Sequence, residues 1–451
     1  MSTPYPNTAV IVGLGKTGFS CARYLRGHGW NIAVTDTREN PPELAKLRAL
    51  DPSVPVRPGG LDTKLLDDAL VVVVSPGVSL AASRFDEERR RGLDIVGDIE
   101  LFARAVDAPV VGITGTNGKS TVTTLVGRMA ARAGMNVRVG GNLGEPALDL
   151  LSAAESDATK TELYVLELSS YQLESTVSLD LKAAAVLNVT PDHMDRYTTI
   201  EDYAAAKARI FARCDTAVIN LDDPLVVAMA RPGQDTLGFS LRSSIGAEYA
   251  VVMGRDSTWW LTRRNELLMP VSDMKIAGLH NAANALAALA LGEALGLPLA
   301  SMLEELRTFP GLPHRSQWVA DVNGVTYVND SKGTNVGATL AAVEGMSGPL
   351  VMIAGGDGKN QDFAPLAAAF RGKVRHTVLI GRDAPAIEIA LSGVCTLERV
   401  ATLEEAVRAA ARAAKPGDTV LLSPACASLD MFRDYTHRGA VFTQAVKELA
   451  A

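Results

Sequence analysis

The sequence predicts an α/β protein of three domains, each built around a mostly parallel sheet. The chain has 451 residues, a length that usually corresponds to about three domains. Short apolar strands alternate with helical segments along the whole chain, as in proteins with parallel sheets. A strand, a glycine-rich turn and a helix follow one another twice, around Gly13–Gly18 and around Gly115–Ser120. We therefore expect a Rossmann-like domain over residues 1–97, a central P-loop ATPase domain over 98–311 and a second Rossmann-like domain over 312–451. In the central domain, we expect a mostly parallel sheet together with a small antiparallel sheet.

Composition limits the classes of binding partner and the cellular compartment that we expect for this protein. Lys and Arg number 44 and Asp and Glu 51, the net charge is −7, and no basic run stands out, which argues against nucleic acid or an anionic membrane as a partner. The 4 cysteines (Cys21, Cys214, Cys395 and Cys426) are far apart without a CxxC motif, which is typical of a reduced chain without a zinc site. No signal-peptide pattern opens the sequence and no apolar run approaches the roughly 18 residues of a membrane span, so we expect a cytoplasmic protein.

The first domain begins with a nucleotide-binding pattern. A strand over Ala9–Val12 leads into Gly13-Leu-Gly-Lys-Thr-Gly18, and a second strand, Asn31–Thr35, ends at Asp36. This is the G-x-G-x-x-G turn followed by an acid about 20 residues later that is typical of dinucleotide-binding domains. A βα turn that binds nothing could have the same pattern. A buried strand over Leu70–Val74 then ends in a Ser-Pro-Gly-Val turn, and we expect the domain to hold a nucleotide-like group.

The central domain begins with the clearest chemical signal of the chain. Val110–Ile113 is an apolar strand, Gly115-Thr-Asn-Gly-Lys-Ser120 is a turn, and a helix follows to Arg132. In this context the turn and the helix N-terminus bind phosphate, Lys119 reaches the β- and γ-phosphates, and the Ser120 hydroxyl can hold Mg²⁺. The strict P-loop pattern requires a further glycine where Ile113 stands. The alternative is an accidental Gly-Lys-Ser sequence in an ordinary βα turn.

Three residues further along the central domain have two readings each. Glu167 ends the strand Glu162–Leu168 and is a candidate for completing a metal site, or else a surface charge. His193 follows the strand Ala183–Asn188 and could be a metal ligand or a hydrogen-bonded loop histidine. Lys207 lies on a helix expected over residues 201–213 and would ordinarily be a solvated lysine.

The rest of the chain completes the second domain and builds the third. Residues 216–275 alternate short strands and turns with an antiparallel appearance, most clearly over 249–253, 259–261 and 267–269. A helix runs from Gly278 to Leu295, and Asn281 and Asn284 at its start either cap it or contact a nucleotide. After a linker at Phe309–Pro313, a candidate hinge, four strands end in small and polar residues. In an open α/β sheet such ends face one ligand cleft. These strands are expected over 326–329, 350–353, 377–380 and 419–422.

Several motifs in a fixed order resemble those of the Mur ligase family. They are Gly112-Ile-Thr-Gly-Thr-Asn-Gly-Lys-Ser-Thr121, Glu167-Leu-Ser-Ser170, Asp192-His-Met-Asp-Arg196, His280-Asn281, His314-Arg315 and Asn329-Asp-Ser-Lys332. Further motifs are similar to those of the members that add D-glutamate to UDP-N-acetylmuramoyl-L-alanine. These are Gly97-Asp-Ile-Glu-Leu-Phe102, Leu187–Tyr197, Gly311–Arg315, Gly355–Lys359 and Leu421–Asp430. The resemblance covers essentially the whole chain.

The resemblance implies a role for each part of the chain. It implies a monomeric ATP-dependent ligase that uses two Mg²⁺ ions and a CO₂-derived carbamate on Lys207. The UDP-substrate would contact Gly15, Lys16, Thr17, Asp36, Thr37, Arg38, Ser75, Gly77 and Asn142. ATP would contact Gly115, Thr116, Asn117, Gly118, Lys119, Ser120, Thr121, Asn281, Asn284, Arg315 and Asp330. The metal ligands would be Ser120, Glu167, His193 and carbamylated Lys207, and the catalytic residues Lys119, His193 and Lys207. The amino acid would contact Lys332, Thr334, Lys359, Ser428 and Tyr435.

Two positions depart from the family pattern, and other functions stay open. Gly333 lies where alanine is usual and Tyr435 where phenylalanine is expected. An oxidoreductase that uses the Gly13–Gly18 turn for NAD would leave the P-loop, Glu167 and His193 without a role. A non-enzymatic nucleotide switch would not need the polar strand ends of the third domain. A ligase for L-glutamate or for another nucleotide precursor is a further alternative. Because water would destroy an acyl phosphate, we also expect the last domain to close over the central one.

Overall fold

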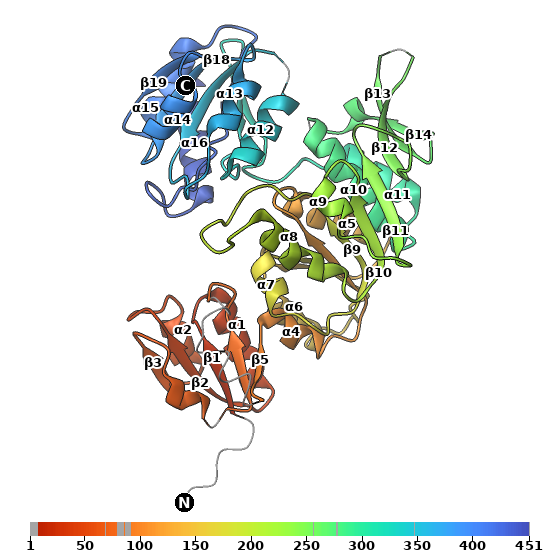
Figure 1. Ribbon diagram of the computed structural model, residues 1–451, viewed down its shortest axis with the longest axis vertical. Coiled ribbons are helices and arrows are strands. Elements are labelled where there is room, and N and C mark those ends of the chain that lie inside the picture. Colours follow the sequence, from red (N-terminus) through yellow and green to blue (C-terminus); the bar gives the residue numbers. More distant parts are fainter. Residues whose placement is uncertain are drawn as a thin grey trace, which may run out of the picture.

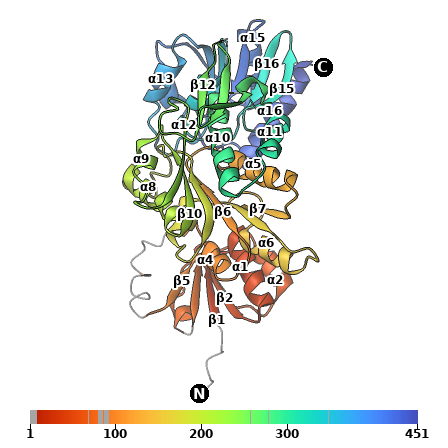
Figure 2. The same cartoon turned by 90° about the vertical axis from the view of Figure 1, so that its right-hand side faces the viewer.

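The computed structural model consists of three α/β units arranged along the long axis of the molecule (Figure 1). It describes residues 8–67, 69–78, 85, 92–255, 257–276, 278–346 and 348–450. The first unit lies at one end, the last unit at the other, and the central unit joins them (Figures 1 and 2). Within these residues, none of the helices has both the length and the apolar character needed to cross a membrane.

The first unit has a five-stranded parallel sheet of order β3-β2-β1-β4-β5. Its strands are β1 (Thr8–Val12), β2 (Asn31–Asp36), β3 (Val56–Pro58), β4 (Val71–Val74) and β5 (Asp94–Val96). Its helices are α1 (Lys16–Gly27) and α2 (Leu44–Leu50), and α4 (Asp98–Ala103) leads into the central unit. The strands β1, β2 and β4 have the positions expected from the sequence, with small shifts at their ends. The apolar runs of β1 and β4 are buried, as central parallel strands require.

The central unit is a nine-stranded mixed sheet of order β14-β13-β12-β11-β10-β9-β6-β8-β7. Its strands are β6 (Val110–Thr114), β7 (Val137–Gly141), β8 (Leu163–Glu167), β9 (Leu181–Val186), β10 (Cys214–Asn220), β11 (Asp235–Ser240), β12 (Tyr249–Met253), β13 (Trp259–Arg263) and β14 (Glu266–Pro270). Its helices are α5 (Lys119–Arg132), α6 (Ala147–Glu155), α7 (Ser170–Glu174), α8 (Ile200–Ala208), α9 (Pro224–Val227), α10 (Leu279–Ala294) and α11 (Leu299–Thr308).

Three details of the central unit differ from the expectation. The antiparallel strands β12, β13 and β14 are present, but they extend the parallel sheet instead of forming a sheet of their own. The strands β10 and β11 are parallel to their neighbours, because the helix α9 crosses between them. The helix expected to reach residue 213 ends as an α-helix at Ala208 and continues as a 3₁₀ turn over Arg209–Phe211.

The last unit has a six-stranded sheet of order β15-β16-β20-β17-β18-β19, in which only β15 is antiparallel. Its strands are β15 (Gln317–Val322), β16 (Val325–Asn329), β17 (Leu350–Gly355), β18 (Val374–Ile380), β19 (Thr396–Arg399) and β20 (Thr419–Leu422). Its helices are α12 (Val336–Gly345), α13 (Ala364–Phe370), α14 (Ala384–Ala390), α15 (Leu403–Ala413) and α16 (Tyr435–Ala450). The four expected strands correspond to β16, β17, β18 and β20. The sequence analysis missed β15 and β19, which are edge strands with few buried residues.

The apolar cores join the first two units but not the last two. One cluster runs from β1 and α1 through Phe102 of α4 to Tyr164 and Leu166 on β8. The faces of the last sheet have clusters of their own. Phe309, at the start of the predicted linker, is buried in a core of the central unit, so the connection to the last unit begins after it.

Candidate active site

Three neighbouring cavities lie at the boundaries between the units. The first, of about 410 Å³, lies between the first unit and the central unit. The second, of about 310 Å³, is lined by residues of all three units. The third, of about 270 Å³, lies between the central and last units. Pro76 and Asn142 line both the first and the second cavity, and Asn117, Gly118, Arg315 and Lys332 line both the second and the third.

The first cavity brings together every residue expected at the UDP-substrate. The lining includes Gly15, Lys16, Thr17, Asp36, Thr37, Arg38, Ser75, Gly77 and Asn142. Asp36 is buried at the end of β2, where its carboxylate accepts hydrogen bonds from the Leu14 N–H at 2.7 Å and from the Arg38 guanidinium. Although burial opposes it, these donors lower the pKa of Asp36 to about 2. The side chain of Asp36 is therefore an anion that fixes the glycine turn and orients Arg38.

The P-loop has the backbone needed to surround a phosphate. Gly115 and Gly118 have φ values of +142° and +83°, which side chains disfavour. A Cβ at Gly118 would also collide with Oδ1 of Asn284. Lys119 starts α5, and its Nζ donates to the carbonyls of Gly115 at 2.9 Å and Thr116 at 2.7 Å. The ammonium thus folds over the loop, the place where a phosphate group would compete with these carbonyls.

Ser120 and Glu167 form the centre of a chain of hydrogen bonds across the site. The Ser120 hydroxyl donates to Oε2 of Glu167 at 2.5 Å, and Asn142 donates to Oε1 at 2.7 Å. From the last unit, Nη2 of Arg315 donates to Oγ of Ser120 at 2.6 Å. Glu167 is 3% exposed. It is therefore not the surface charge that the alternative reading proposed, and it connects the P-loop to the wall of the first cavity.

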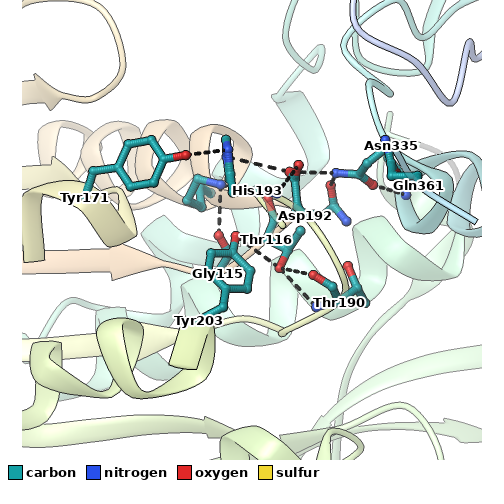
Figure 3. Close-up of polar contacts among 12 residues, drawn as sticks. Gly115, Thr116, Tyr171, Thr190, Asp192, His193, Tyr203, Asn335 and Gln361 are labelled. Carbon is teal, nitrogen blue, oxygen red and sulfur yellow. Dashed lines mark hydrogen bonds and ion pairs between the residues drawn. The ribbon is translucent and has the colours of Figure 1, made fainter. Parts of the chain in front are cut away.

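His193 lies on the opposite side of the second cavity, between an aromatic residue and an acid (Figure 3). The hydroxyl of Tyr171 is 2.8 Å from Nδ1 of His193, and the His193 N–H donates to Asp192 at 2.9 Å. Burial lowers the pKa of His193, so the neutral ring is favoured near neutral pH. Asn335, the N-cap of α12 in the last unit, donates to Oδ2 of Asp192 at 3.2 Å.

Lys207 is buried, not solvated as its position on a helix suggested. Its side chain is 1% exposed, Nζ donates to the Gly115 carbonyl at 3.0 Å, and Nζ lies 4.2 Å from the ring centroid of Tyr203. Burial and then the nearby positive Lys119 lower the pKa of Lys207 well below its ordinary value. Both effects disfavour the protonated form of Lys207.

The last unit contributes Lys332, Thr334 and Lys359 to the second cavity. Burial, and then the positive charge of Arg315, lower the pKa of Lys332 to about 8. Its Nζ lies 4.1 Å from the ring centroid of Tyr435, a cation–π contact that stabilises the ammonium. Tyr435 and Ser428 were expected at the same site but do not line this cavity. Ser428 is buried in the loop after β20.

The third cavity is lined by several of the residues expected to contact ATP. Asn281 and Asn284 lie in the first turn of α10, where Nδ2 of Asn284 donates to Oδ1 of Asn281 at 3.2 Å. Asp330 directly follows β16 and accepts from the Ser316 N–H and the Ser423 hydroxyl, and burial raises its pKa to about 6. Thr121, Asn117, Gly118 and Arg315 line the same cavity.

The second cavity carries a strong excess of positive charge. Its lining has five basic side chains (Lys119, Lys207, Arg315, Lys332 and Lys359) and two carboxylates, Asp192 and Glu167. Like charges so close together are stable only when anions neutralise them. The arrangement therefore suits the approach of several anionic groups to one point in front of the P-loop.

Sequence reasoning assigned no site role to several residues that line this cavity, among them Tyr171, Asp192, Tyr203 and Asn335. Tyr171 lies on the short helix α7, shortly after β8, and Tyr203 lies on α8. Asn335 follows Thr334 directly after a polar strand end, and its position before an apolar helix signals an N-cap. Nothing in the sequence indicates that the same side chain reaches Asp192 in another domain.

Family models and relatives agree over almost the whole chain. Residues 7–97 match the Mur ligase MurD-like N-terminal domain, 113–292 the Mur ligase middle domain, and 314–426 the Mur ligase glutamate ligase domain. A protein of Nitrosococcus oceani is 52% identical over 98% of this chain and 97% of its own length. One of Pseudomonas aeruginosa is 52% identical over 98% of both chains. Both are named UDP-N-acetylmuramoylalanine–D-glutamate ligase.

Solved structures show the same fold at low sequence identity. A pseudomurein peptide ligase of Methanothermus fervidus superposes with a TM-score of 0.63 at 17% identity, over 98% of this chain and 100% of that one. The UDP-N-acetylmuramate-alanine ligase of Thermotoga maritima has a TM-score of 0.60 at 18% identity, over 98% of this chain and 99% of that one. The three-unit architecture is thus that of known ligases.

Proposed function

The chain belongs to the Mur ligase family, and on that premise we propose that it joins D-glutamate to UDP-N-acetylmuramoyl-L-alanine, with ATP converted to ADP and phosphate. The relatives at 52% identity over nearly the full chain carry this name. We place the enzyme in the cytoplasm as a monomer that makes peptidoglycan precursors, so its loss would affect cell shape and division.

The continuity of the three cavities is the structural observation that best supports this reaction. Pro76 and Asn142 connect the first cavity to the second, and Asn117, Gly118, Arg315 and Lys332 connect the second to the third. A long UDP-linked substrate in the first cavity would extend its terminal carboxylate past Asn142 toward the P-loop. ATP in the third cavity would extend its γ-phosphate to the same point. The amino acid would approach from the Lys332 side.

The proposed chemistry follows from the charges around that point. A carboxylate is a poor acylating agent, so its oxygen first attacks the γ-phosphorus of ATP, ADP leaves, and an acyl phosphate results. The amine of glutamate then attacks the acyl carbon, and the tetrahedral intermediate expels phosphate. Lys119 and Arg315 neutralise the two anions that meet in the first step and stabilise charge on the transferring phosphoryl group. Closure of the last unit would exclude water from the acyl phosphate.

Magnesium fits the donors at the end of the P-loop. The Ser120 hydroxyl and the Glu167 carboxylate are hard oxygen ligands, both buried and in direct contact. Bound there, Mg²⁺ would screen the phosphate charges during transfer. In the part of the chain that the structure describes, no three His, Cys, Asp or Glu side chains gather as a metal site. A second Mg²⁺ would therefore need His193, phosphate oxygens and a new anion on Lys207.

We propose that Lys207 supplies that anion as a carbamate. Its neutral amine would add to CO₂, forming an N–C bond and releasing one proton, and the product would be anionic. The cavity suits this change, since an anion at Lys207 would offset the positive charge of nearby Lys119. Lys207→Ala should abolish activity, and a short carboxylic acid should partly restore it. Full activity of the variant without rescue would contradict the carbamate role.

The amino-acid site is the least determined part of the proposal. Lys332, Thr334 and Lys359 line the reaction cavity. Ser428 lies in the loop after β20 and Tyr435 is the first residue of α16, and neither lines that cavity. We propose that Lys359 and Ser428 bind the two carboxylates of glutamate and that Lys332 and Thr334 orient it. A ligase for L-glutamate would use the same contacts in another arrangement, so the chirality must be measured.

The deciding experiment is phosphate release from ATP with UDP-N-acetylmuramoyl-L-alanine, Mg²⁺ and bicarbonate, run in parallel with D-glutamate and L-glutamate. We expect release that depends on D-glutamate. Release with L-glutamate alone would leave the mechanism intact and show that the amino-acid specificity assigned to the pocket of the last unit is wrong. Nucleotide binding without release would favour a nucleotide switch, and binding of NADH in place of ATP would favour an oxidoreductase.

A further inference from the structure

The last unit contains a fully buried arginine outside the reaction cavity. Arg438 lies in the first turn of α16 and is 1% exposed. Its five N–H donors meet five acceptor contacts. Nε donates to the Ser331 hydroxyl at 3.0 Å, Nη1 to the carbonyls of Cys426 at 3.1 Å and Ala427 at 3.4 Å, and Nη2 to the carbonyls of Ser331 at 2.8 Å and Cys426 at 3.1 Å.

These contacts connect the loops in which the proposed amino-acid ligands lie. Ser331 directly precedes Lys332 in the loop after β16, and Cys426 and Ala427 directly precede Ser428 in the loop after β20. The Ser331 hydroxyl also donates to the carbonyl of Tyr435 at 2.8 Å. Ala427 exchanges backbone hydrogen bonds with Asp357, two residues before Lys359. Arg438 therefore binds the backbone next to Lys332 and next to Ser428 directly. It is connected to the loop of Lys359 through the pairing of Ala427 with Asp357.

The charge of Arg438 is balanced by carbonyl dipoles and not by an adjacent acid. Among the described residues, none of the ion pairs within 4.0 Å includes Arg438. Burial lowers its pKa to about 10, so it is still protonated near neutral pH. A buried cation without a partner acid costs more free energy than an apolar side chain of similar size. A large apolar residue at this position would fill the same space without the cost of burying a charge.

We propose that Arg438 is a positioning residue for the amino-acid substrate, whose planar guanidinium holds the Ser331–Lys332 and Cys426–Ser428 backbones at the spacing that a dicarboxylate requires. This inference rests on the proposed function. The planar fork of the guanidinium is what allows a single side chain to bind two backbone segments. A lysine retains the charge but directs its donors from one atom, so it can hold only one of the two loops well.

The test compares the Michaelis constants for the three substrates in Arg438→Lys and Arg438→Met. We expect the KM for D-glutamate to rise by about tenfold in the methionine variant and by less in the lysine variant, as for the loss of one to two charge-assisted hydrogen bonds. The KM values for ATP and the UDP-substrate should change by less than about twofold, because neither cavity borders Arg438. Rescue by lysine should be partial.

A matched control separates positioning from stability. Val446 lies on the same helix, is fully buried in a core of the last unit and contacts none of these loops through hydrogen bonds. Val446→Ala should lower the melting temperature and leave the KM for D-glutamate unchanged. Ser331→Ala serves if both Arg438 variants fail to fold. It removes one acceptor of the guanidinium, and we expect a rise of about threefold in the KM for D-glutamate alone.

The outcomes are distinguishable. Unchanged KM for D-glutamate in the foldable variants, an equal rise for all three substrates, or the same rise in Val446→Ala would overturn the positioning role. Wild-type protein without phosphate release in the presence of D-glutamate would overturn the proposed function, and the role of Arg438 in it would fall as well.

Discussion

The two junctions between the units differ in their apolar contacts, although both also contain polar ones, such as that of Ser20 with Asp149 at the first junction. The first unit and the central unit share one apolar core, in which the ring of Phe102 lies 5.2 Å from that of Tyr164 in an edge-to-face arrangement. The central and last units meet through polar side chains, such as Arg315 on Ser120 and Asn335 on Asp192. Apolar contact is costly to separate in water, whereas hydrogen bonds between units can be exchanged for hydrogen bonds to water.

The contrast suggests that one junction is fixed and the other opens. The fixed junction forms the first cavity, in which the large substrate would bind to a preformed surface. The junction that we propose to open forms the second and third cavities, where ATP and the amino acid would enter and the products would leave. We propose the segment after Phe309 as the hinge, because Phe309 itself is buried in a core of the central unit.

The largest expected effect is therefore a movement of the whole last unit. A non-hydrolysable ATP analogue with the UDP-substrate should make the protein more compact in small-angle scattering, since both ligands supply anions that attract the cations of the last unit. Arg315→Ala should reduce this compaction. Scattering curves that do not change on addition of the two ligands would refute a mobile junction.

Substitutions in the apolar junction should have the largest effect on the free energy of unfolding. Phe102→Ala should lower the free energy of unfolding of the first two units by about 3–5 kcal/mol, the usual loss for a fully buried phenylalanine. The matched substitution Phe370→Ala lies in a core of the last unit alone. Calorimetry should show the two variants shifting different transitions. A shift of the same transition by both would mean that the three units unfold together.

A buried acid at the apolar junction gives a second, smaller effect. Asp98 begins α4, accepts from Nε2 of Gln172 at 2.9 Å, and has its Oδ1 buried without a hydrogen bond from the described residues. Burial raises the pKa of Asp98 to about 6. A raised pKa means that the folded protein holds the proton more tightly, so this contribution to stability is fully present below about pH 4 and is lost as the pH rises through about 6.

Asp98→Asn should remove this pH dependence because an amide does not ionise. The unfolding free energy of the variant relative to wild type should rise by on the order of 2 kcal/mol between about pH 4 and about pH 7. Denaturant titrations at several pH values measure it. A difference that is constant across this range would show that Asp98 is not held protonated by the junction.

Predictability from sequence also differs between the two junctions. The turns around Gly13 and Gly115 depend on neighbours in the chain, so their local patterns predicted the strands, the helices and much of the lining of the cavities. Lys207 shows the limit, since a helix position resembling a solvated lysine is buried only because Gly115 and Tyr203 pack over it. The contact of Asn335 with Asp192 and the burial of Arg438 depend on the pairing of distant segments, which no local pattern encodes.

The polar junction can be tested at Asn335 without loss of its helix cap. Asn335→Ser and Asn335→Asp both keep an oxygen that can accept from the Ala338 N–H, so the stability of α12 should change little. Serine is too short to reach Asp192, and aspartate would place a second carboxylate against it. We expect kcat/KM to fall by about threefold in the serine variant and by about tenfold in the aspartate variant, because like charges oppose closure. Equal rates in the two variants would indicate that the Asp192 contact does not contribute to closure.

The smallest expected effect concerns Tyr435, where phenylalanine was expected from the family. The ring supports Lys332 at 4.1 Å, and the backbone carbonyl accepts from Ser331, whereas the hydroxyl has no hydrogen-bond partner within the described residues. Tyr435→Phe retains the ring and the backbone, so the KM for the amino acid should stay within about twofold of wild type. Tyr435→Ala loses the contact with the ammonium, and its KM should rise by about threefold to fivefold. If phenylalanine impairs binding as much as alanine does, the hydroxyl contacts the substrate, and the amino-acid site extends beyond the cavity toward α16.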